Sequence, residues 1–162
     1  MIDSPRVEIR SPLRLVELRR DVVIPFSDVA GPTIGQLFDL LNQHAIEPLG
    51  PLLFHYWRIV MPELTVGFGV PVAEDCIVPD SLTEAVLPGG RYATLTYFGP
   101  YEGLVEATAT LLAFIAHSGD APDFERRADG EHFAGRFELY PNGPDDEPDP
   151  ARWETQIFIK LA

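Results

Sequence analysis

Residues 90–119 read GRYATLTYFGPYEGLVEATATLLAFIAHSG, and two different periodicities follow each other in this stretch. From Tyr92 to Tyr97 the side chains alternate between two sets, as they do in a strand with two distinct faces. From Leu104 onward, apolar residues recur at helical spacing, and Gly119 suits a C-terminal helix cap. The stretch therefore predicts a strand that passes through a turn into a helix.

The first half of the chain shows the same order of elements. Residues 13–25 predict a strand, and a helix is predicted from Thr33 to about Pro48. The first ten residues are interpreted as a lead-in, and residues 120–134 as polar and irregular. The remaining strands are predicted at 52–60, 63–72, 135–141 and 152–161.

The order strand, helix, strand, strand thus occurs twice, and it defines the expected architecture. We expect one domain over residues 1–162, built from two βαββ repeats at about 11–75 and 88–162. Each repeat is smaller than the commonest domain size, so the two are expected to share one antiparallel sheet. The predicted fold class is α+β, with pseudo-two-fold symmetry and both helices on one face. A ligand cleft is expected where the halves meet.

The charge of the chain argues against several kinds of partner. The net charge is −13, and an acidic surface repels the phosphate backbone of nucleic acids, so no direct nucleic-acid partner is expected. The apolar runs are far shorter than the roughly 20 residues of a membrane span, and the N-terminus lacks the apolar region of a secretory signal. We therefore expect a cytoplasmic protein without a membrane partner.

Metal and cofactor chemistry finds little support in the sequence. Cys76 is the single cysteine, which excludes an internal disulfide and the common zinc clusters. The four histidines, at positions 44, 55, 117 and 132, show no ligand spacing. No nucleophile–base order and no glycine-rich phosphate loop can be recognised. We expect neither a metal nor a cofactor.

A carboxylate interrupts an otherwise apolar strand near the C-terminus. Glu138 lies in the sequence FELY at positions 137–140. A buried, unpaired carboxylate costs several kcal/mol, so Glu138 either faces water or faces a site that receives a cation. Aromatic residues beside such a carboxylate would add cation–π attraction and stacking.

The faces of the other strands remain open at this point. His55 and Trp57 share one face of their strand, and Phe54 and Tyr56 share the other, so Tyr56 or Trp57 is expected to line the cleft. Phe68 could belong to the core or to the cleft. Tyr92 and Tyr97 lie on opposite faces of one strand, so at most one of them points at the cleft. On the strand at 152–161, Phe158 shares its face with Gln156 and is the candidate.

Four stretches together resemble a known family: VPV at 70–72, GGRYATLTYFGPYEGL at 89–104, FELYPNG at 137–143 and WETQIFIKL at 153–161. They are similar to the gyrase-inhibitor-like (GyrI-like) small-molecule-binding domains, whose relatives include effector-binding domains of multidrug-sensing bacterial transcription regulators. The resemblance implies that cationic or aromatic ligands bind between the halves and that Glu138 is the carboxylate of that pocket. Some stand-alone members resemble hydrolases of cyclopropane-bearing alkylating compounds. Gln156 departs from the family, because a carboxylate is common there.

The main hypothesis is a stand-alone binding module for cationic or aromatic drug-like molecules, which can have a protein partner or form a homodimer. The expected ligand-binding residues are Glu138, Tyr140, Tyr56, Trp57, Phe68, Tyr92, Gln156 and Phe158. The first alternative is a hydrolase of reactive electrophiles, in which Glu138 acts on water and Tyr97 or Tyr140 donates to the leaving oxygen. The second alternative is a topoisomerase-inhibitor-like protein that interacts through its acidic surface.

Overall fold

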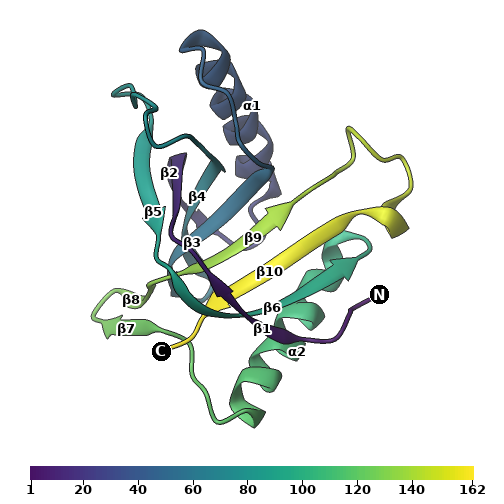
Figure 1. Cartoon of the computed structure of the whole chain (residues 1–162). Helices are drawn as coiled ribbons and strands as arrows, with labels where there is room; N and C mark the ends of the chain where they lie inside the picture. The colour runs from purple at the N-terminus through teal and green to yellow at the C-terminus, as the bar shows by residue number, and fades with distance from the viewer.

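A computed structural model describes all of residues 1–162, with two α-helices and ten strands in one antiparallel sheet (Figure 1). The strands are β1 (Arg6–Arg10), β2 (Leu13–Val23), β3 (Leu52–Val60), β4 (Glu63–Pro71), β5 (Thr83–Leu87), β6 (Gly90–Phe98), β7 (Phe124–Arg127), β8 (Gly130–Phe133), β9 (Arg136–Tyr140) and β10 (Glu154–Lys160). The helices are α1 (Ser27–Gln43) and α2 (Leu104–His117), and two short 3-10 turns are η1 (Tyr101–Gly103) and η2 (Pro150–Arg152).

The strand order forces the sheet to curl. The order is β1-β6-β10-β9-β3-β4-β2-β5, with the hairpin β7–β8 attached to β3 through β8. In a flat sheet with this order, β1 and β2 would lie about 29 Å apart. Only Ser11 and Pro12 connect these two strands, and a link of that length spans about 11 Å. Pro88 and Gly89 make an equally short connection between β5 and β6, so the two ends of the sheet must approach each other.

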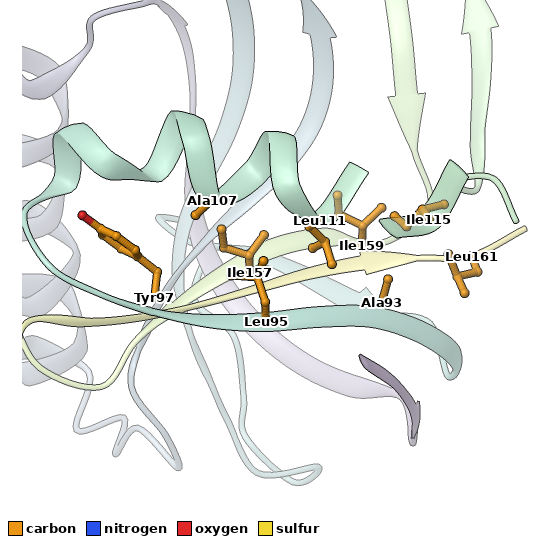
Figure 2. Packing of buried hydrophobic residues seen from close by; sticks show 9 residues of the cluster. All are labelled: Ala93, Leu95, Tyr97, Ala107, Leu111, Ile115, Ile157, Ile159 and Leu161. Atoms are coloured by element: carbon orange, nitrogen blue, oxygen red, sulfur yellow. The ribbon is translucent and has the colours of Figure 1, made fainter. Parts of the chain in front are cut away.

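Both helices cover the same face of this sheet, which we call the helix face. Helix α1 buries Leu37 and Leu41 against Val16 of β2 and Val70 of β4. Helix α2 covers the other half, where its buried residues Ala107, Leu111 and Ile115 recur every four positions. Figure 2 shows these three side chains packed against Leu95 of β6 and against Ile157 and Ile159 of β10. The predicted α+β class, with an antiparallel sheet and both helices on one face, is confirmed.

The opposite face, which we call the inner face, lines the inside of the curl. One apolar cluster joins residues from both ends of the sheet, and it consists of Leu15, Leu53, Ala85, Leu87, Tyr92, Phe137 and Phe158. The rings of Phe137 and Phe158 are stacked with their centroids 4.7 Å apart. The curl thus has an apolar core of its own, distinct from the packing under the two helices.

Several predicted boundaries are wrong. The supposed lead-in contains β1, which pairs with β6, and the irregular segment 120–134 contains the hairpin β7–β8. Helix α1 begins at Ser27 rather than Thr33, with Pro32 inside it. The turns before Pro32 are kept because Val29 and Ala30 pack on the sheet, which outweighs the one hydrogen bond that proline cannot donate.

The division into repeats at 11–75 and 88–162 stays a prediction. Neither α1 nor α2 combines the length and the hydropathy that a transmembrane helix requires.

Candidate functional site

Glu138 lies on the helix face, on the central strand β9. Its direct cross-strand neighbours are Phe54 of β3 and Ile157 of β10. Directly paired residues of antiparallel strands point to the same face, and Ile157 packs under α2. Strand β3 leads toward the half covered by α1, so Glu138 stands between the regions that the two helices cover. Its side chain is buried, with 7% of the residue exposed.

Two tyrosine hydroxyls hold the Glu138 carboxylate. The hydroxyls of Tyr56 on β3 and Tyr140 on β9 each donate a hydrogen bond of 2.6 Å to Oε1. No hydrogen bond is made by Oε2. No lysine, arginine or histidine forms an ion pair with Glu138. The site therefore contains a buried carboxylate that has neutral donors but no cationic partner.

Burial determines how these three groups ionise. It raises the pKa of Glu138, although the two hydroxyl bonds and the charge of Arg136 act in the opposite direction. Burial first, and then the neighbouring carboxylate, raise the pKa of Tyr56 and that of Tyr140 well above the ordinary phenol value. Both hydroxyls consequently stay protonated near neutral pH and remain hydrogen-bond donors.

Aromatic rings surround the carboxylate on two sides. On the sheet, the Phe54 ring contacts Tyr140 with 4.6 Å between centroids and Phe68 with 4.8 Å. Toward the surface, Tyr101 of η1 forms a T-shaped pair with Tyr140, with 5.9 Å between centroids, and stacks on Trp153 at 4.9 Å. These rings form a continuous path from Glu138 to half-buried Trp153.

The structure brings together half of the residues expected to bind the ligand. Glu138, Tyr140, Tyr56 and Phe68 gather on the helix face. The other four expected residues, Trp57, Tyr92, Gln156 and Phe158, lie on the inner face. For Gln156 and Phe158 the reason is the register of β10, which places Ile157 opposite Glu138 and so turns its two neighbours to the other side.

Tyr97 lies on the helix face but is separate from the carboxylate. It packs in the cluster beneath α2 (Figure 2). Its hydroxyl donates to the Pro100 carbonyl at 2.7 Å. Close by is an open groove of about 630 Å³, lined by Met1, Tyr97, Phe98, Gly99, Pro100, Ala151 and Arg152. This groove includes none of the residues around Glu138.

Sequence reasoning missed three residues of the site. Phe54 could have been found, because it alternates with Tyr56 and must share its face. No pattern in the sequence assigns Tyr101 or Trp153 to the site. Their stacking depends on how the loop between β9 and β10 folds back on η1, which no periodicity encodes.

Removing one hydroxyl should make Glu138 harder to ionise. In a Tyr56→Phe variant the carboxylate loses one of its two donors, and a hydrogen bond to a charged group contributes about 1.5–3 kcal/mol. We expect the pKa of Glu138 to rise further, measured by NMR titration of the ¹³C-labelled carboxyl group. Tyr97→Phe is the matched control, since that hydroxyl donates to Pro100. An equal rise in both variants would contradict the assigned hydrogen bond.

The curled antiparallel sheet carries two helices on one face, with the Glu138 carboxylate and aromatic rings between them. This arrangement defines a class of α+β domains and not one particular protein. Comparison of the sequence with family models makes the assignment more specific. The chain belongs to the GyrI-like small molecule binding domain family, whose model matches residues 4–162. No curated protein matches the sequence.

Solved structures with the same fold have low sequence identity. The crystal structure of the EcmrR C-terminal domain has a TM-score of 0.72 at 18% identity, and the match covers 98% of this chain and 97% of that domain. In the EcmrR–DNA complex the matched part is 57% of the EcmrR chain, at a TM-score of 0.72 and 19% identity. This chain therefore corresponds to little more than half of that longer protein.

Of two further solved structures, one is a complex with a small molecule and the other is that of a hydrolase. SAV2435 bound to tetraphenylphosphonium has a TM-score of 0.61 at 12% identity, with 99% of this chain and 94% of that chain covered. A hydrolase from Listeria innocua has a TM-score of 0.61 at 12% identity, with 98% and 91% covered. Both share the fold.

Proposed function

We propose that this protein binds lipophilic organic cations on the helix face, with Glu138 as their charge partner. The observation that carries the proposal is a buried carboxylate with no ion pair, held by two hydroxyls and surrounded by aromatic rings. A carboxylate of this kind is costly to keep ionised, and an incoming cation removes much of that cost. The rings of Phe54, Tyr140 and Tyr101 supply stacking surfaces and cation–π attraction.

The hydrogen-bond arrangement favours a cation that has no polar hydrogens. Because both hydroxyls donate to Oε1, they keep the carboxylate in place without neutralising its charge. A bulky cation with a delocalised or shielded charge can approach Oε2 through space, and no particular hydrogen-bond pattern is demanded of it. Several unrelated cations can then share the site. Tetraphenylphosphonium, which SAV2435 binds, is a cation of this kind.

Entry of the ligand requires the rings to move. Tyr101 packs against Tyr140 and stacks on Trp153, and the Trp153 indole N–H donates to the Glu147 carbonyl at 2.8 Å. Both residues lie on short turns or loops rather than in the sheet, where displacement costs least. Separation of this stacked pair is the opening step in the proposal.

A hydrolase is the second candidate function, and one observation favours it. Burial raises the pKa of Glu138, which suits a carboxylate that must take and return a proton during a reaction. Tyr140 or Tyr56, rather than Tyr97, is then the donor to the leaving oxygen, because their hydroxyls lie beside the carboxylate. Chromatographic detection of a hydrolysed product from a cyclopropane-bearing electrophile would establish this activity. Unchanged substrate after incubation with the protein would remove it.

The binding function is tested by changing the charge of the ligand and keeping its shape similar. Isothermal titration calorimetry compares tetraphenylphosphonium with neutral triphenylphosphine oxide, which carries three of the same rings. We expect micromolar affinity for the cation and at least tenfold weaker binding of the oxide. Equal affinities would show that the rings alone select the ligand, and no heat with either would reject the proposed function.

A further inference from the structure

A second buried carboxylate lies on the inner face. Glu17 of β2 is fully buried, with 0% exposed, and three side chains reach it. The Trp57 indole N–H donates to Oε1 at 2.6 Å, and Nδ1 of His55 lies 3.1 Å from Oε2. The Arg19 guanidinium approaches Oε1 at 3.5 Å. We call Glu17, Arg19, His55 and Trp57 the Glu17 cluster.

The sheet leaves space for this cluster at two glycines of β4. Strand β4 lies between β2, which carries Glu17, and β3, which carries His55 and Trp57. A methyl group at Gly67 would overlap the Glu17 carboxylate, and one at Gly69 would lie 2.9 Å from Glu17 Cβ. The glycines therefore let Glu17 reach across a whole strand to its partners, so the arrangement depends on specific residues of three strands.

The cluster contains an acceptor that is not used. When Glu17 is ionised and the His55 imidazole is neutral, Nδ1–H of His55 donates to Glu17, and Nε2 is left as an acceptor. This nitrogen is buried and has no hydrogen-bond partner, and 1% of His55 is exposed. Buried polar atoms are normally paired, so an unpaired one indicates a missing donor. The His55 ring also lies against Trp57, with 4.1 Å between centroids.

Arg19 already places a guanidinium beside Glu17 and over the Trp57 ring, but from a constrained position. It is two residues from Glu17 on the same strand, and its guanidinium carbon lies 3.9 Å from the Trp57 ring centroid. Because Arg19 and Glu17 share a backbone, the guanidinium reaches the carboxylate through one nitrogen at 3.5 Å. Bidentate contacts between a guanidinium and a carboxylate are shorter, at about 2.7–2.9 Å. The Arg19 side chain is 39% exposed, so it can leave.

We propose that the Glu17 cluster is a second cation site, specific for small molecules that carry a guanidinium or amidinium group, and that Arg19 is its built-in competitor. A free guanidinium would stack on Trp57, pair with Glu17 without the constraint of a shared strand and offer a further N–H to His55. The site differs in selectivity from the one at Glu138, since its acceptors require a planar cation with N–H donors.

The test follows the Trp57 indole N–H, which is bonded to Glu17, by ¹H–¹⁵N NMR during titration with methylguanidinium chloride at constant ionic strength. Trp153→Phe assigns the signal, because Trp57 and Trp153 are the two tryptophans of the chain. Tetramethylammonium, which has equal charge and no N–H donor, is the control cation. We expect a saturable shift in the Arg19→Gln variant, at least tenfold weaker binding in the wild type, and no saturable shift with tetramethylammonium.

Three further variants complete the test. Glu17→Gln should abolish the shift in the Arg19→Gln background, whereas Glu125→Gln should not alter it, because it removes the same charge from an exposed position on β7. Arg19→Lys has no planar group to stack on Trp57 and should also bind more tightly than the wild type, which covers a failure of Arg19→Gln to fold. Absence of a saturable shift in the folded Arg19 variants, or equal affinity in variants and wild type, would overturn the proposal.

Discussion

Glu138→Gln is expected to weaken the binding of tetraphenylphosphonium about a hundredfold. Removing one partner of a buried charge pair typically costs about 2–5 kcal/mol, and a hundredfold change corresponds to about 2.7 kcal/mol. Glutamine keeps the size of the side chain and can still accept hydrogen bonds from Tyr56 and Tyr140. The loss would therefore be due to the missing charge, measured by isothermal titration calorimetry at fixed ionic strength.

A control is needed because the chain carries a net charge of −13, which attracts cations from a distance. Glu125→Gln removes the same charge from the exposed end of β7, where the carboxylate pairs with Arg127. This variant should change the affinity less than twofold. If both variants lost affinity equally, the general field of the protein, and not the carboxylate on the helix face, would be responsible.

The same binding should weaken in acid. Burial raises the pKa of Glu138, so protons compete with the cation at a higher pH than for an ordinary glutamate, whose pKa is about 4.3. Affinity should fall as the pH decreases through this raised pKa, and Glu138→Gln should remove that dependence.

The effect of pH on the stability of the fold has the opposite sign. The folded state holds the Glu138 proton more tightly than the unfolded state does. The protonated Glu138 therefore contributes to the free energy of unfolding at low pH, and this contribution is lost as the pH rises through the raised pKa.

Gly67→Ala is expected to lower the free energy of unfolding by about 3–5 kcal/mol, the range found when a buried charge is left without its partners. The added methyl group would overlap the Glu17 carboxylate and force it away from His55 and Trp57. Glu17 is fully buried, so no water is available to replace those partners. Urea unfolding followed by far-ultraviolet circular dichroism measures the change.

Gly35→Ala is the matched control for this substitution. Gly35 lies inside helix α1, and a methyl group there meets nothing within 4 Å. Alanine is favoured over glycine in a helix by about 1 kcal/mol, so this variant should be slightly more stable than the wild type. A Gly67→Ala protein as stable as the wild type would show that the Glu17 carboxylate can relocate without cost.

The sequence was most informative where one short segment decides the outcome. The change from alternation to helical spacing at residues 90–119 predicted β6 and α2, and alternation in β3 correctly separated Phe54 and Tyr56 from His55 and Trp57. It could not place Phe158, because the face that a strand presents depends on its register with a neighbour. That register is set by contacts between segments distant in the chain.

Glu17 shows a different limit of sequence reasoning. Its position in an alternating strand indicated a face but not a partner, since its contacts come from β3 across an intervening strand. The paired glycines at 67 and 69 were the available signal, because glycine inside a strand often marks close approach of another group. Edge strand β1 was missed for a related reason, as a strand of five residues with charges at alternate positions is also typical of an extended lead-in.

Strand β3 supplies donors to both buried carboxylates, with Tyr56 bonded to Glu138 on one side and Trp57 to Glu17 on the other. The strand is irregular at this point, where its pairing with β4 shifts between Tyr56 and Arg58. A small rotation of the backbone there would move consecutive side chains in opposite directions. Events on one surface of the sheet would thus be communicated to the other through a single peptide unit, and any resulting thermodynamic coupling would be reciprocal.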